Sequence, residues 1–276
     1  MNRMRFLHIP KTAGTSFTEI LLRQYGDKGH FVFSGDLEKD IERYKRGLDR
    51  GEEISLFLGH APIETGIEDA DSASMITFLR DPVARVKSFC QHVYEGKSPY
   101  LLESFPPEDF DLDRFLDSGN PEISNLQTKM LTGSGSFMDG SHIEGLSASE
   151  AVDMALENLY TRVDAYGLQE YFDESLIHFK KKFSWHPPYY IRRNRKSAIK
   201  RLAFEKRHIE KIEELNRLDM ELYGKAKIDF MKIVKGTVDS DELAAFRRAN
   251  TYMGPLIGGG FRVRNLIRRY LPGDKN

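Results

Sequence analysis

The sequence has only one cysteine, Cys90, among its 276 residues, which excludes an internal disulfide framework. A chain this poor in cysteine is typical of a reducing compartment. No apolar run approaches the ~18 residues that a membrane span requires. The N-terminal stretch also lacks the apolar core of a signal peptide, because His8, Pro10 and Lys11 interrupt it. We therefore expect a soluble, cytoplasmic protein of bacterial type with no transmembrane segment.

An excess of charge of either sign is also lacking. The 41 Lys and Arg residues nearly balance the 42 Asp and Glu residues, which gives a net charge of −1. Overall charge therefore provides no reason to expect a nucleic acid or a membrane surface as partner. No cluster of His, Cys and Asp residues has metal-ligand spacing, so we expect no metal. The composition, 40% hydrophobic and 30% charged, is that of a globular protein with one large domain or two small ones.

The most informative stretch joins a short apolar segment to a helical one. Residues 4–9 predict a buried strand, and residues 15–25 predict a helix with apolar side chains at helical spacing. Between them, Lys11 precedes a turn of small residues, namely Thr12, Ala13, Gly14, Thr15 and Ser16. Free backbone N–H groups and the helix dipole favour an anion at such a helix start, and small side chains let a phosphate approach. The simpler interpretation is a buried strand followed by a threonine-rich helix cap.

A second strand is predicted at residues 54–58 and is followed by Gly59 and His60. Open α/β sheets bind ligands at the carboxyl ends of their strands, which is where His60 falls. Imidazole is also the usual side chain for accepting a proton near neutral pH. A loop histidine without a chemical role is the other interpretation of this position.

A third strand, residues 75–79, leads into Arg80 and a predicted helix that Asp81 caps. An arginine at a strand end can hold a phosphate with two hydrogen bonds. Ser88, about two helical turns later, can donate its hydroxyl. An ordinary strand–helix junction would also explain this pattern, and Cys90 falls on the buried stripe of the helix.

The order Pro-Lys-Thr-Ala-Gly-Thr-Ser at residues 10–16 lacks the spacing of the nucleotide triphosphate loop, in which Gly-Lys-Ser/Thr follows four residues after a first glycine. It resembles the phosphosulfate loop of sulfotransferases that use 3′-phosphoadenosine 5′-phosphosulfate (PAPS). Arg80 and Ser88 resemble the 3′-phosphate motif of the same family. The resemblance covers residues 4–234 and is nearest the heparan 2-O, chondroitin and HNK-1 type carbohydrate sulfotransferases.

The resemblance implies an α/β fold of three layers, P-loop-like, with a central, mainly parallel sheet flanked by helices. It implies transfer of a sulfuryl group from PAPS to an acceptor hydroxyl, on a carbohydrate, with PAP as the other product. His60 would be the base, and Lys11 would stabilise the leaving phosphate together with the small-residue turn. Arg80 and Ser88 would hold the 3′-phosphate, which distinguishes the donor from ATP.

Later segments add weaker candidates for the site. The resemblance makes Tyr166 a neighbour of the cofactor. Separately, the excess of Lys and Arg over residues 192–211 indicates a basic loop, which contains Arg193 and Lys196 and could clamp the 3′-phosphate or an acidic polysaccharide. A solvated helix face would explain that basic loop equally well. Three polar residues are candidates for the acceptor site: Asn125, Gln127 and Lys129.

We expect a sulfotransferase domain over residues 1–235 and a C-terminal extension over residues 236–276. In that extension, residues 254–260 predict a flexible joint and residues 261–271 a basic amphipathic helix, which could dock on the domain or touch an anionic membrane surface. Two other functions stay open. A nucleotide or small-molecule kinase would prefer ATP with magnesium, and a non-catalytic nucleotide- or glycan-binding module would bind without transfer.

Overall fold

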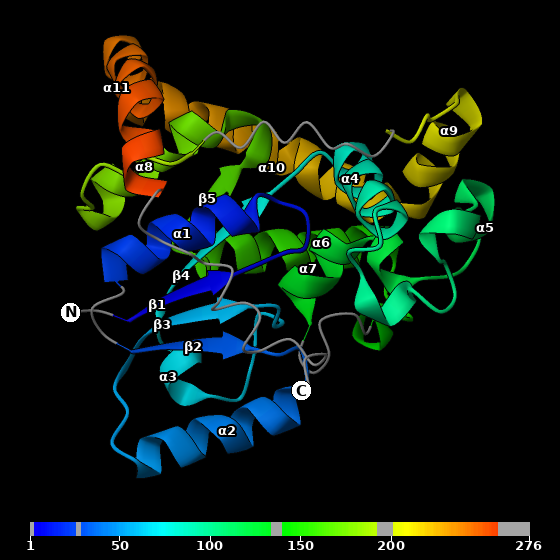
Figure 1. Cartoon of the computed structure of the whole chain (residues 1–276), viewed down its shortest axis with the longest axis horizontal. Helices are drawn as coiled ribbons and strands as arrows, with labels where there is room; N and C mark the ends of the chain where they lie inside the picture. Colours follow the sequence, from blue (N-terminus) through cyan, green and yellow to red (C-terminus); the bar gives the residue numbers. More distant parts are fainter. Residues whose placement is uncertain (1–2, 26–28, 134–139, 192–200, 259–276) are drawn as a thin grey trace.

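Five parallel strands form one sheet in the computed structural model, which describes residues 3–25, 29–133, 140–191 and 201–258. The strand order is β2-β3-β1-β4-β5. The strands are β1 (Met4–Leu7), β2 (Gly29–Phe33), β3 (Ile54–Gly59), β4 (Ser74–Leu79) and β5 (Ala165–Leu168). Because β1 lies between β3 and β4, the loops that follow these three strands meet at one edge of the sheet (Figure 1).

Helices cover both faces of this sheet (Figure 1). The helices are α1 (Gly14–Tyr25), α2 (Leu37–Asp49), α3 (Glu68–Asp71), α4 (Pro82–Tyr94), α5 (Leu112–Leu116), α6 (Leu126–Thr132), α7 (Ala148–Thr161), α8 (Phe172–Phe183), α9 (Lys206–Leu215), α10 (Arg217–Thr237) and α11 (Ser240–Gly258). Short 3₁₀ turns include η1 (Pro99–Leu101), η3 (Pro121–Ile123), η4 (Ser141–Ile143) and η5 (Gln169–Tyr171).

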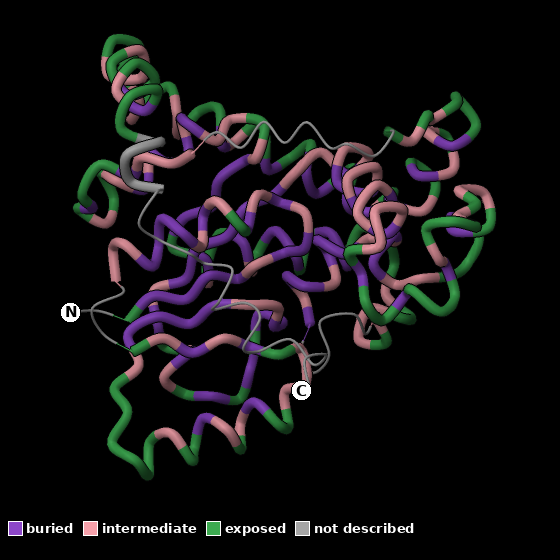
Figure 2. Tube along the Cα trace, viewed as in Figure 1, coloured by how far each residue is buried: buried purple, intermediate pink, exposed green. Residues whose placement is uncertain are grey.

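Two apolar clusters separate the faces. Side chains of α1 and α8 pack on one face of β1, β3 and β4, and side chains of α6, α7 and α10 pack on the opposite face, against β1, β4 and β5. Strands β1, β3, β4 and β5 are accordingly almost continuously buried, whereas the edge strand β2 is buried only in part (Figure 2). The predicted fold, three layers around a parallel sheet, is confirmed.

Local signals account for most of the element boundaries near the site. Asp81 accepts a hydrogen bond from the amide of Ala84, 2.8 Å away, and Pro82 opens α4, as the sequence predicts. Strand β1 is shorter than expected, because it ends at Leu7 and not at residue 9. Strand β2 was not predicted, although its Phe-Val-Phe segment at residues 31–33 consists of residues that are favoured in strands.

The C-terminal third differs more from expectation. The apolar spacing of residues 212–223 is that of one amphipathic helix, but the chain breaks at Asn216 between α9 and α10. The Asn216 amide donates to the carbonyls of Ile123 and Ile212, at 2.7 and 2.9 Å, so contacts from distant parts of the chain fix this break. The predicted joint is wrong for residues 254–258, which continue α11, and residues 259–260 lie outside the described residues.

Helix α11 packs on α8. Phe246 lies in the cluster between them, and Arg247 pairs with Asp173 and Glu174 at 3.0 and 2.9 Å. The boundary between residues 1–235 and 236–276 stays a prediction, and the basic helix at 261–271 lies outside the described residues. Among the helices that the structure describes, none is long and apolar enough to cross a lipid bilayer.

Candidate active site

The loop between β1 and α1 has an unusual backbone. Lys11 and Ala13 have φ angles of 70° and 82°, in the left-handed region that residues with a Cβ rarely adopt. The Thr12 hydroxyl fixes the turn by donating to a main-chain carbonyl at the strand end, 2.8 Å away. The first helical hydrogen bond runs from the amide of Phe17 to the carbonyl of Ala13, so the helix supplies no partner for the amides of residues 14–16. Strained backbone and free amides at a helix start favour an anion.

Gly14 is required by a neighbouring histidine. A Cβ at Gly14 would lie 1.6 Å from Nε2 of His8, so no other residue fits while this ring keeps its position. The His8 ring stacks on Phe6, with centroids 5.0 Å apart, and burial lowers its pKa well below the usual range. His8 is therefore a neutral ring that fills the space under the loop.

His60 is connected to this loop through His8. Its Nδ1 lies 2.7 Å from the carbonyl oxygen of His8, and the two rings are 4.3 Å apart. A carbonyl can only accept, so Nδ1 carries the proton and Nε2 keeps its lone pair. Burial lowers the pKa of His60 below its ordinary value, although the hydrogen bond to the carbonyl of His8 opposes this effect. At neutral pH His60 is thus an uncharged imidazole whose Nε2 can accept a proton.

Arg80 and Lys11 lie together. Nη1 of Arg80 donates to the main-chain oxygen of Lys11, 2.9 Å away, which joins the ends of β1 and β4. The Arg80 Nε is buried and has no hydrogen-bond partner among the described residues. The two cationic residues predicted to bind opposite ends of one nucleotide are therefore neighbours.

The side chains of Gln127 and Glu170 hold the main chain of Arg80 and Asp81 in place. The buried amide of Gln127 accepts from the Arg80 N–H and donates to the Arg80 carbonyl, both at 2.9 Å. Glu170 accepts from the Asp81 N–H at 3.0 Å and from the hydroxyl of Tyr223 at 2.9 Å. The position of Arg80 is thus set by α6 and by the turn after β5.

The electrostatic surroundings of Lys11 favour a bound anion. Burial, together with the nearby charges of Arg80 and Lys97, lowers the pKa of Lys11 to about 8. The carboxylates of Glu122 and Glu95 oppose this shift without cancelling it. Cations that lower one another's pKa repel each other, and a bound anion reduces this repulsion. Binding of an anion therefore stabilises the site.

The other predicted site residues are placed less directly. Thr15 is exposed and Ser16 partly exposed in the first turn of α1, next to the loop, and Ser88 is partly exposed on α4. Tyr166 is buried in the core, and its hydroxyl donates to the carbonyl of Ala226 at 3.0 Å, which gives no support to a cofactor contact. The remaining two candidates, Arg193 and Lys196, lie outside the described residues.

The three acceptor-site candidates have different surroundings. Asn125 accepts from the amides of Leu218 and Asp219, at the start of α10, and so has a structural contact. Gln127 is fully buried behind Arg80 and cannot touch an acceptor. Lys129 is partly exposed and lines a pocket.

Sequence reasoning missed several residues of this site. In the sequence, His8 interrupts an apolar run. Its position after the strand and before a glycine-containing loop also indicates a place in the site. Burial of His92 on α4, together with the nearby charges of Lys11 and Lys97, lowers its pKa to about 4. Glu122 is another charged residue of the site whose position no local pattern indicates.

The described residues contain no group of three or more His, Cys, Asp or Glu side chains that could hold a metal ion. Cys90 is buried, and burial raises the pKa of its thiol to about 12, so it is a poor nucleophile at neutral pH.

Comparison with known proteins adds one finding. A model described as "Sulfotransferase family" matches residues 1–226, a range that includes the loop at Lys11, His60 and the Arg80–Ser88 segment. A search of curated proteins found no match.

Proposed function

The chain belongs to the sulfotransferase family, whose members transfer sulfuryl groups, and we propose that PAPS is its donor and a carbohydrate hydroxyl its acceptor. The observation that carries this proposal is the hydrogen bond from Arg80 to the carbonyl of Lys11. It brings a guanidinium suited to a 3′-phosphate next to an amine and free amides suited to a phosphosulfate.

The residues of the site fit such a donor. The left-handed loop and the amides of residues 14–16 would hold the 5′-phosphosulfate, and Arg80 with Ser88 would hold the 3′-phosphate. PAPS supplies a sulfuryl group on a good phosphate leaving group. Lys11, the only loop residue with a full charge, would neutralise the negative charge that develops as the sulfur–oxygen bond to phosphate breaks.

His60 would take the proton of the acceptor hydroxyl on Nε2. Its Nδ1–H is directed at the carbonyl of His8, which fixes the ring and the tautomer and stabilises the imidazolium that forms. Gly14 leaves room for the ring of His8, and the main-chain carbonyl of His8 accepts the hydrogen bond from His60. The same glycine therefore keeps the loop accessible to a phosphate and makes space for the residue that positions His60.

The donor is tested first, by calorimetric titration with PAP, ATP and GTP in the presence of magnesium. We expect PAP to bind and Arg80→Ala to weaken it at least tenfold, as loss of a charged bidentate contact would. Preference for ATP with magnesium would indicate a kinase instead.

Transfer of radiolabelled sulfate from PAPS to a panel of glycans tests the reaction. His60→Ala should lower kcat by ~10²–10⁴-fold, the usual contribution of a general base. His186→Ala, a substitution of an exposed histidine, is the matched control and should leave kcat unchanged. PAP binding without transfer by the wild-type protein would indicate a non-catalytic module, and full activity of His60→Ala would exclude His60 as the base.

A further inference from the structure

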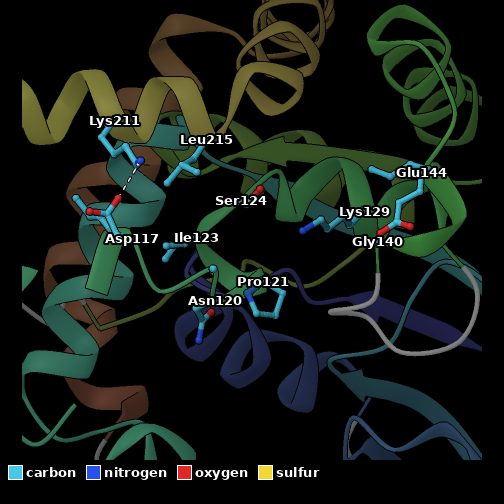
Figure 3. Close-up of a pocket in the computed structure, with 13 residues that line it drawn as sticks. Asp117, Asn120, Pro121, Ile123, Ser124, Lys129, Gly140, Glu144, Lys211 and Leu215 are labelled. Carbon is cyan, nitrogen blue, oxygen red and sulfur yellow. Dashed lines mark ion pairs between the residues drawn. The ribbon is translucent and has the colours of Figure 1, made fainter. Parts of the chain in front are cut away.

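A pocket of about 510 Å³ lies beside η3, between the end of α5, α6 and α9 (Figure 3). We call it the η3 pocket. Its volume is in the range of small-molecule sites. Apolar side chains of Leu116, Ile123 and Leu215 form part of its wall, and polar side chains of Asn120 and Ser124 lie among them.

The charged side chains of the η3 pocket are balanced. Two lysines, Lys129 and Lys211, face two carboxylates, Asp117 and Glu144 (Figure 3). Lys211 and Asp117 already form an ion pair of 2.9 Å. The wall therefore offers donors and acceptors in similar number, without the excess of positive charge that a polyanion requires.

The pocket adjoins the site at Lys11. Glu122 lies between two pocket residues, Pro121 and Ile123, but its own side chain is buried, bonds to the hydroxyl of Tyr100 and is close enough to Lys11 for each charge to shift the other's pKa. The short turn η3 thus contributes two residues to the pocket wall and one buried carboxylate whose charge acts on Lys11.

Helix α6 makes a second connection. Its Gln127 holds the main chain of Arg80, and two residues later Lys129 enters the pocket. The Lys129 side chain runs along Gly140, since a Cβ there would lie 2.8 Å from its Cε. One rigid element therefore presents one residue toward the donor site and another toward the pocket.

We propose, on the basis of the sulfotransferase function proposed above, that the η3 pocket binds an uncharged sugar unit of the acceptor. A pyranose presents apolar C–H faces and a rim of hydroxyls, which matches an apolar wall with balanced donors and acceptors. Charge balance at the pocket selects a neutral glycan over a sulfated or uronate-rich polymer.

The test uses the full-length protein, labelled PAPS and two kinds of acceptor probe. The neutral probes are the methyl β-glycosides of glucose, galactose and N-acetylglucosamine, and the anionic probes are heparan and chondroitin chains. Ser124→Trp fills the pocket, and Lys129→Met removes a donor from its wall. Ser149→Trp, on the exposed first turn of α7, is the control for a surface tryptophan.

We expect wild-type transfer to at least one neutral glycoside. Ser124→Trp should raise the KM for that glycoside at least tenfold and Lys129→Met should raise it less, while the Kd of PAP changes less than twofold in both. Transfer to the anionic chains only, transfer to neutral glycosides that Ser124→Trp leaves unchanged, or PAP binding without transfer to any neutral probe would each overturn the pocket assignment. Failure of the wild-type protein to bind PAP would instead overturn the donor proposal.

Discussion

If PAP binds at Lys11 as we propose, the lowered pKa of this lysine should make the affinity depend on pH. With a pKa of about 8 in the free protein, Lys11 is about 90% protonated at pH 7 and about 10% protonated at pH 9. The charged form binds the phosphate, so the Kd of PAP should increase about tenfold over this interval. The phosphates of PAP have second pKa values near 6 and add little above pH 7.

Three titratable side chains near Lys11, namely His60, His92 and Glu122, have pKa values shifted by burial. Burial lowers the pKa of His60 below 6.5 and that of His92 to about 4, so both are neutral above pH 7. The pKa of Glu122 is raised by burial from 4.5, and its hydrogen bond to Tyr100 opposes that shift. The expected sign is thus set by Lys11, and affinity falls as pH rises.

Calorimetry measures both consequences. Binding should take up about half a proton per PAP at pH 8, because the phosphate raises the pKa of a lysine that is half charged. This uptake is read from binding enthalpies in buffers of different ionisation enthalpy. Lys11→Arg keeps a charge that does not titrate in this range and should bind with no pH dependence between 7 and 9.

Lys97 offers a second check on the same reasoning. It is a like charge near Lys11, so Lys97→Gln should raise the pKa of Lys11 and move the midpoint of the affinity curve to higher pH. A wild-type Kd that is constant from pH 7 to 9, without proton uptake, would refute the account of Lys11.

Two further substitutions test how the site is built. Gly14→Ala places a Cβ on the ring of His8, so it should lower the free energy of unfolding by ~1–3 kcal/mol and remove most of the activity. Gly224 is an exposed helical glycine with open space around it, so the control Gly224→Ala should stabilise the protein by ~0.5–1 kcal/mol. Thermal melting and turnover measure both variants, and equal effects would contradict the steric argument. Gln127→Ala leaves the N–H and carbonyl of Arg80 without partners, at ~1–3 kcal/mol each, and should weaken PAP binding. Gln127→Glu keeps the acceptor but cannot donate to the Arg80 carbonyl and adds a negative charge beside the proposed anion site, so it should also weaken PAP binding. Wild-type Kd values in both variants would exclude a positioning role.

The sequence predicts the parts of the site that depend on local signals. Lys11 before a small-residue turn, and Asp81 with a proline after it, are recognised within a few residues, and both are found at strand ends as expected. Gln127 contributes through hydrogen bonds to Arg80, 47 positions away, and Glu122 through the effect of its charge on Lys11, so no local pattern indicates them. The break at Asn216 was missed for the same reason, because its partners lie in a different segment.

Contacts between distant segments also bring several buried cations together at the sheet edge where the loops after β1 and β4 meet. These cations favour the binding of an anion. Arg80 and the fully buried Arg85 have guanidinium nitrogens without hydrogen-bond partners among the described residues, and burial lowers the pKa of both, as it does for Lys11. A buried cation without a partner costs free energy that the fold must offset elsewhere. The carboxylates of Asp219 and Glu122 compensate Arg85 only in part. We expect an anion held between Lys11 and Arg80 to remove part of this cost, and this relief would contribute to the affinity for the doubly anionic donor that we propose.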